Sequence, residues 1–174
     1  MYSWRITKYN PAFRISNGSY NKPEWSSFSD IGKSFEGVEL SLNEYLQIES
    51  KYINAIILFI NNLKIPYLKI LDLEKYTLSN EIINKYKKIY PYKIVNIFNK
   101  IKNNAKYNIE EIDVISKLVL REHIWLKLEY ENKFFIHFGY DYYLYIGSII
   151  KNNLLIDKII NDGLFVEEYN SPYM

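Results

Sequence analysis

The chain has 174 residues, 48% of them hydrophobic, and a net charge of +2. This length is enough for one domain with its own buried core. The lack of cysteine excludes disulfides, thiolate metal sites and cysteine nucleophiles. No apolar run approaches the roughly 18 residues that cross a bilayer, and the first residues lack the apolar segment of a secretory signal. We therefore expect a cytoplasmic protein that makes no membrane contact.

Charge is unevenly distributed along the chain. Residues 79–108 carry seven lysines and a single acid, Glu81, which gives this segment a local charge of +6. Residues 109–174 carry eleven acids and six bases, which gives a local charge of −5. Such polarity can steer a charged partner toward one side of a molecule, although lysine is also the ordinary surface residue in a chain of this composition.

The first 63 residues predict a strand, a long ordered loop and a helix. Residues 4–9 alternate polar and apolar side chains as a strand does, and a Pro at position 11 follows. Residues 10–37 are rich in Asn, Ser, Gly and Pro but also carry many large apolar groups, so we expect an ordered loop packed by its own aromatic side chains. Ser41 and Glu44 have the spacing of a capping box, which begins a helix that runs to about residue 63.

Glu49 lies within the apolar stripe of that predicted helix. An unpaired carboxylate would be strongly destabilised there, because burial removes its hydration. We therefore expect a cationic partner, either Arg5 or Arg121. The simplest interpretation of such a pair is structural rather than functional.

The middle of the chain predicts further helices around one strand. Residues 67–73 are typical of a short strand. Residues 80–90 are weakly helical, and residues 92–103 have the apolar spacing of an amphipathic helix. Asn108 begins another helix, with acids in its first turn. Residues 79–108 thus predict a Lys-rich helical segment, similar to an insertion, within the domain.

The last third predicts a β-hairpin first. Residues 124–130 and 134–140 alternate as two strands, and we expect the three-residue loop between them to place Asn132 in the left-handed conformation. This register pairs Leu128 with Ile136 and turns one apolar face toward the core. The opposite face then carries Trp125, Lys127, Glu129, Phe135 and His137.

A third strand and a last helix complete the predicted fold. Residues 142–146 follow as a strand, residues 149–162 as a helix ended by Gly163, and residues 164–168 as a terminal strand. The sequence therefore predicts one α+β domain over residues 1–174. We expect a mostly antiparallel sheet, with an N-terminal strand and a C-terminal meander, packed with four or five helices.

The usual catalytic motifs are absent, including phosphate-binding glycine loops, the nucleophile elbow and zinc-binding histidine pairs. The best enzyme candidate is a metal-independent ribonuclease with His123 and His137 as acid and base. Arg121 or Lys127 would stabilise the developing charge. The hairpin register places Lys127 opposite His137, but nothing directs His123 into the same cleft. We expect no catalytic residues, no metal and no cofactor, and keep this ribonuclease as an alternative.

The hairpin face offers another alternative, an RNA-binding sheet. Trp125, Phe135 and a tyrosine from residues 140–145 could stack on bases, while Arg5, Lys127 and the Lys-rich segment contact phosphates. The same aromatic face could equally be covered by the N-terminal loop or by a helix.

The densest local motif is G-Y-D-Y-Y at residues 139–143. Gly139 permits an unusual backbone dihedral angle, and Asp141 favours a turn. A tyrosine-rich segment suits a protein-binding patch, because tyrosine gives a large contact area at low entropic cost. The alternative is a tyrosine-lined edge of the core.

Other motifs are W-R-I-T-K-Y-N-P at residues 4–11, E-W-S-S-F-S-D-I-G at residues 24–32 and G-L-F-V-E at residues 163–167. Together with the motif at residues 139–143, they resemble a family of small bacterial cytoplasmic proteins. The resemblance covers nearly the whole chain except residues 77–107. It implies one compact domain and no particular activity.

Size, composition and the lack of a catalytic set give the chain a profile similar to that of nuclease inhibitors. These include immunity proteins that neutralise toxins and phage anti-CRISPR proteins that block RNA-guided RNases. Inhibitors that mimic nucleic acid are usually strongly acidic and this chain is not, so we expect contact away from the substrate channel or with a bound guide RNA. The predicted function is a non-enzymatic protein, monomeric or weakly dimeric, that binds and inhibits a bacterial nuclease. The expected contact residues are Tyr20, Trp25, Phe28, Asp30, Tyr140, Asp141 and Tyr142, with an electrostatic contribution from Lys85, Lys87, Lys88 and Lys93.

Overall fold

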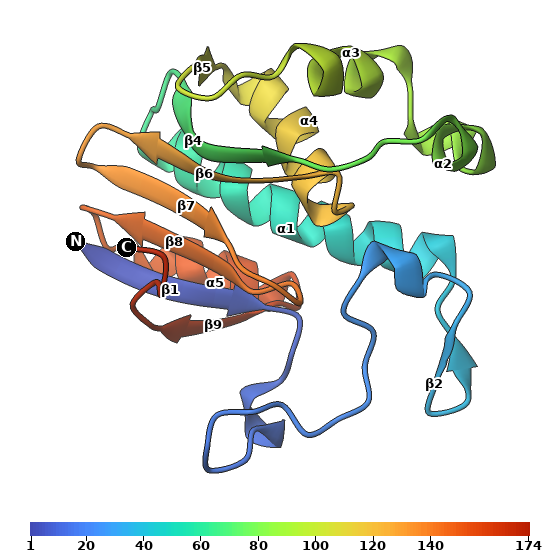
Figure 1. Cartoon of the computed structure of the whole chain (residues 1–174). Coiled ribbons are helices and arrows are strands. Elements are labelled where there is room, and N and C mark those ends of the chain that lie inside the picture. The colour runs from blue at the N-terminus through green and yellow to red at the C-terminus, as the bar shows by residue number, and fades with distance from the viewer.

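The computed structural model describes residues 1–174, and its centre is a seven-stranded sheet in which all neighbouring strands are antiparallel (Figure 1). The strand order is β5-β4-β6-β7-β8-β1-β9. The strands are β1 Tyr2–Thr7, β4 Leu68–Lys75, β5 Lys106–Tyr107, β6 Ile124–Tyr130, β7 Phe134–Phe138, β8 Leu144–Ser148 and β9 Phe165–Glu168. Because β1 lies between β8 and β9, the two ends of the chain share one part of the sheet.

Helices cover one face of this sheet (Figure 1). The covering helices are α1 Leu42–Asn62, α4 Ile109–Leu120 and α5 Asn153–Asn161, whereas α3 Tyr92–Lys100 lies outside α4 and α2 Asn80–Lys85 lies beyond the end of β4. α1 packs against α4 and α5, and α3 packs on α4. A single cluster of 37 buried residues joins the sheet to these helices, which confirms the predicted α+β single domain. No helix combines the length and apolar character needed to cross a membrane.

The predicted hairpin between β6 and β7 is confirmed, with Leu128 opposite Ile136. The loop has the predicted three residues, but the prediction for its left-handed residue is wrong, because Glu131, with a φ of 51°, takes that conformation in place of Asn132. The turn closes through a hydrogen bond from the Lys133 N–H to the Tyr130 carbonyl at 3.1 Å. With Tyr130 and Lys133 at its two ends, the turn has Glu131 as its first central residue. Hairpin turns of types I′ and II′ require a positive φ at that position.

Residues 10–37 form an ordered loop, as predicted. They contain two 3-10 turns, Pro11–Phe13 and Phe28–Asp30, and contribute to a small hairpin of β2 Ser34–Phe35 and β3 Val38–Glu39. Aromatic side chains attach the loop to the domain, since Phe28 is buried and Trp25 packs against the core.

The Lys-rich segment, residues 79–108, belongs to the same domain. It contains α2, a 3-10 turn at Lys87–Ile89, α3 and the edge strand β5. Tyr90, Ile94 and Ile97 are buried in the common core. The two predicted helices are therefore present, the second ending at Lys100, whereas β5 was not predicted.

The C-terminal segment, residues 169–174, crosses the sheet face opposite the helices (Figure 1). Ser171 Oγ lies 2.8 Å from His137 Nδ1, and the Tyr173 ring centroid lies 5.8 Å from that of Trp125. We expected either an open aromatic face or cover from the N-terminal loop or a helix. The structure instead covers this face with the end of the chain.

Candidate binding surface

The link between β7 and β8 is a tight turn. The Tyr143 N–H donates to the Tyr140 carbonyl at 3.1 Å, and the Gly139 N–H donates to the Tyr143 carbonyl at 2.6 Å. Asp141 and Tyr142, at the tip, have φ values of 54° and 61°, as in a type I′ turn. Asp tolerates this left-handed conformation, but a bulky tyrosine in it is strained. Other contacts must therefore hold Tyr142 in place.

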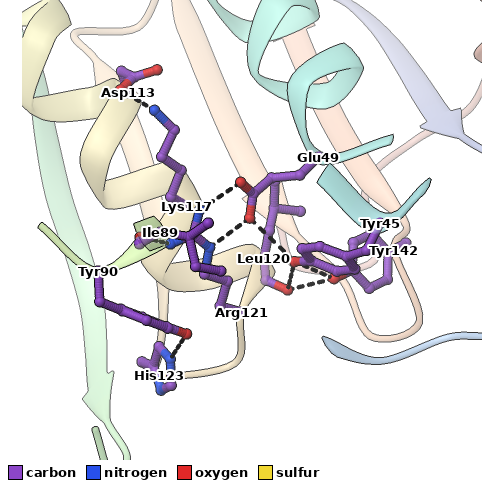
Figure 2. Close-up of polar contacts among 10 residues, drawn as sticks. All are labelled: Tyr45, Glu49, Ile89, Tyr90, Asp113, Lys117, Leu120, Arg121, His123 and Tyr142. Atoms are coloured by element: carbon purple, nitrogen blue, oxygen red, sulfur yellow. Dashed lines mark hydrogen bonds and ion pairs between the residues drawn. The ribbon is translucent and has the colours of Figure 1, made fainter. Parts of the chain in front are cut away.

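Buried hydrogen bonds supply those contacts. The Tyr142 phenol oxygen lies 2.8 Å from that of Tyr45 and donates to the Leu120 carbonyl at 2.5 Å (Figure 2). The Tyr52 hydroxyl donates to the Tyr142 carbonyl at 2.7 Å. Burial raises the pKa of all three tyrosines well above the usual range, so their hydroxyls stay protonated. The turn is thus fixed by neutral donors from α1 and by the end of α4.

Glu49 has the cationic partner that its buried position predicted, and this partner is Arg121 (Figure 2). Arg121 Nε and Nη2 donate to the two carboxylate oxygens of Glu49, both at 2.7 Å. Its Nη1 donates to the Ile89 carbonyl at 2.6 Å. Arg5 pairs instead with Glu167, at 3.1 Å. Arg121 is therefore engaged in a buried pair that connects α1, the end of α4 and the Lys-rich segment.

A cavity of about 320 Å³, which we call the turn hollow, lies beside the β7–β8 turn. Eleven of its fifteen lining residues are hydrophobic. The apolar and aromatic lining includes Tyr76, Val119, Leu120, Trp125, Phe138 and Tyr140. Glu122 and Asp141 also line it, and no basic side chain does. The turn hollow is therefore an apolar site that carries negative charge.

Glu122 contributes an exposed carboxylate to the turn hollow. It accepts a hydrogen bond from Ser27 Oγ at 2.8 Å and has no basic partner. Partial burial raises the pKa of Glu122, and the negative charges of Asp30 and Asp141 raise it further. Asp30 itself is paired with Lys33 at 2.9 Å. The charges of Glu122 and Asp141 are thus left without a counter-ion.

The structure presents only part of the predicted contact set to solvent. Tyr140 is 74% exposed, and Asp141 is exposed beside it. Phe28 and Tyr142 are buried. Trp25 is partly buried, with its ring centroid 5.0 Å from that of Tyr142. The available contact residues are therefore concentrated at the tip of the turn.

Lys8 is a buried cation that sequence reasoning missed. Its Nζ lies 3.3 Å from a carboxylate oxygen of Glu24 and 4.2 Å from the ring centroid of Trp25. Tyr20 donates to the other carboxylate oxygen of Glu24 at 2.5 Å. Burial lowers the pKa of Lys8 to about 8. Lysine is so frequent in this chain that no sequence signal distinguishes Lys8 from the others. The contacts of Lys8 and Tyr20 with Glu24 stabilise the N-terminal loop against the strand end.

The two histidines have separate surroundings. His123 Nε2 lies 2.6 Å from the Tyr90 hydroxyl (Figure 2), and its Nδ1 lies 3.1 Å from the Thr77 carbonyl. His137 contacts Ser171 beneath the C-terminal segment. Both imidazoles are buried, and burial lowers the pKa of each. The structure therefore does not bring the predicted acid and base into one cleft.

The four predicted surface lysines are exposed on α2, the adjoining 3-10 turn and α3. Lys93 lies 3.8 Å from Glu110. Lys85, Lys87 and Lys88 form no ion pair. This part of the Lys-rich segment is thus an unpaired positive surface. No group of three His, Asp or Glu side chains is arranged to hold a metal ion.

The chain matches no protein-family model, no curated protein and no solved structure. The features of the molecule that bear on function are therefore the turn, the turn hollow and the Lys-rich segment.

Proposed function

We propose that the chain is a non-enzymatic cytoplasmic protein that binds and inhibits a bacterial nuclease, with Tyr140 at the centre of the contact. The partner is an RNA-guided RNase, which makes the chain an anti-CRISPR protein, or a toxin, which makes it an immunity protein. The profile that the chain shares with nuclease inhibitors, in size, composition and lack of a catalytic set, supports both forms.

The observation that carries this proposal is the exposure of Tyr140 on a fixed turn. Its side chain is 74% exposed, while the neighbouring Tyr142 is held in a strained conformation by buried hydroxyls. A rigid aromatic side chain loses little entropy on binding, and such residues dominate the energetics of protein interfaces. A turn whose strain is balanced by internal hydrogen bonds is suited to presenting that side chain.

The charge distribution supports a nuclease as the partner. Proteins that bind nucleic acid carry basic surfaces, and the turn hollow beside Tyr140 carries the unpaired acids Glu122 and Asp141. The exposed Lys85, Lys87 and Lys88 supply the opposite charge. In a complex with an RNA-guided RNase, we expect these lysines to contact bound RNA.

The alternative, an RNA-binding sheet face, has less support. Tyr173 packs on Trp125, and two basic side chains of that face, Lys127 and Arg5, are already in ion pairs. Lys127 lies 2.9 Å from Asp72, and Arg5 lies 3.1 Å from Glu167. These two cations, already neutralised by carboxylates, attract phosphates only weakly.

An affinity capture from bacterial lysate, with and without RNase treatment, tests the proposal. We expect mass spectrometry to identify a nuclease that is retained at equal stoichiometry after RNase treatment. The purified nuclease should lose its RNA-cleaving activity when the wild-type chain is added. Tyr140→Ala should weaken this binding by about 30-fold or more, because an interface hot spot contributes about 2 kcal/mol or more.

Tyr92→Ala is the matched control, since Tyr92 is an exposed tyrosine at the start of α3, 82% accessible to solvent. It should bind like the wild type. A larger loss for Tyr92→Ala than for Tyr140→Ala would move the contact surface to the Lys-rich segment. Recovery of RNA alone, lost at raised salt, would replace inhibition with RNA binding.

A further inference from the structure

The turn hollow has a surplus of negative charge that the domain itself does not neutralise. Glu122 and Asp141 line it without an ion-pair partner. The nearest basic residue along the chain, Arg121, turns its guanidinium onto Glu49. Glu122 and Asp141 are both exposed acids whose negative charges face one cavity without a counter-ion, so a cation from outside would find a site of complementary charge here.

Aromatic rings complete the environment for such a cation. Tyr76, Trp125 and Tyr140 line the turn hollow together with the two acids. The faces of these rings carry partial negative charge and attract cations within about 6 Å. Tyr76 also donates its hydroxyl to Glu74 at 2.8 Å, which brings a further carboxylate near the same wall.

The apolar lining selects the kind of cation. Val119, Leu120 and Phe138 offer no ligands to a hydrated metal ion, and the chain has no metal-binding cluster. Hydrocarbon walls instead suit the aliphatic stem of a basic side chain. Guanidinium is more weakly hydrated than ammonium, stacks on aromatic faces and pairs with carboxylates through several donors. A cavity of about 320 Å³ is at the small end of ligand sites, which begin at about 300 Å³.

We infer that the turn hollow receives an arginine side chain of the partner protein, with its guanidinium between Glu122, Asp141 and the surrounding rings. This inference rests on the proposed function, because it treats Tyr140 and the turn hollow as one contact surface. The partner is then a protein that exposes an arginine on a basic surface.

The test removes charge while keeping shape. Asp141→Asn retains a residue that tolerates the left-handed conformation, and Glu122→Gln retains an acceptor for Ser27. The probe is N-acetyl-arginine methylamide, compared with its uncharged citrulline analogue. The readout is the set of backbone amide shifts of residues 139–143 in two-dimensional NMR. We expect saturable shifts when the arginine probe is added to the wild-type chain, and at least fivefold weaker binding of the citrulline probe. A chain that carries both Asp141→Asn and Glu122→Gln should bind the arginine probe at least fivefold more weakly than the wild type does.

Glu36→Gln is the matched control, since Glu36 is an exposed acid with a φ of 49°, like Glu122 with 62°. It should bind the arginine probe like the wild type. Equal binding of the two probes, or no saturable shift with arginine, overturns the inference. In either case, weaker nuclease binding by Tyr140→Ala would still support the proposed function. The proposed function is contradicted if Tyr140→Ala binds the nuclease as tightly as the wild type does, whatever the result with the arginine probe.

Discussion

At the scale of single residues, the domain depends on two buried charges that are stable only together. Glu49 and Arg121 are each about 95% or more buried as side chains, at 4% and 3% exposure, and they bind each other through two hydrogen bonds. Removing one partner leaves an uncompensated buried charge, which typically costs about 3–5 kcal/mol. We expect Arg121→Met to lose that much unfolding free energy, as measured by urea denaturation.

A double-mutant cycle separates the pair from the packing around it. Glu49→Met combined with Arg121→Met removes both charges and fills the space with apolar groups. The double variant should be more stable than Arg121→Met alone, because no charge remains buried without a partner. If the single Arg121→Met variant were as stable as the wild type, water or another polar group would have to stabilise the Glu49 carboxylate in place of Arg121.

At the scale of elements, the C-terminal segment acts as cover for the open sheet face. The Tyr173 ring packs 5.8 Å from Trp125 and 5.9 Å from Tyr145 between ring centroids. We expect Tyr173→Ala to lower the free energy of unfolding by about 1–3 kcal/mol, because a partly buried aromatic group is lost. Met174→Ala is the control, since Met174 is 84% exposed. Equal stability of the two variants would mean that the segment does not hold the face.

Regular elements were predictable where the side-chain pattern is long enough to identify them. The seven residues of β6 and the capping box at Ser41 gave clear signals, and both are present in the structure. The strands β2, β3 and β5 have two residues each. A strand of two residues has no periodicity, so only its tertiary pairing defines it.

The candidate site was predictable only in part, for a related reason. Glu49 was marked by its place in an apolar stripe, and the motif at residues 139–143 by its density of tyrosine. The turn hollow was not predictable, because Tyr76, Glu122 and Tyr140 come from separate parts of the chain. The cover over His137 was missed because Ser171 is an ordinary polar residue until the fold brings the two together.

At the scale of the whole molecule, buried histidines make stability depend on pH. Burial, aided by the Lys127 ammonium, lowers the pKa of His137 to about 4, and the Asp72 carboxylate opposes this only in part. Burial also lowers the pKa of His123. In the unfolded chain both histidines titrate near about 6.5. Below that pH the unfolded state binds more protons than the folded state, so the free energy of unfolding falls as the pH drops from about 6.5 toward 4.

The contribution of His137 can be isolated with a neutral replacement. His137→Gln keeps a side chain that can hydrogen-bond to Ser171 but cannot take up a proton near neutral pH. We expect its unfolding free energy to fall less between about pH 7 and about pH 5 than that of the wild type, because the shifted imidazole is gone. Urea denaturation at the two pH values measures the difference. The same fall in both proteins would mean that His137 is protonated in the folded state, and hence that the C-terminal segment opens readily enough to admit water.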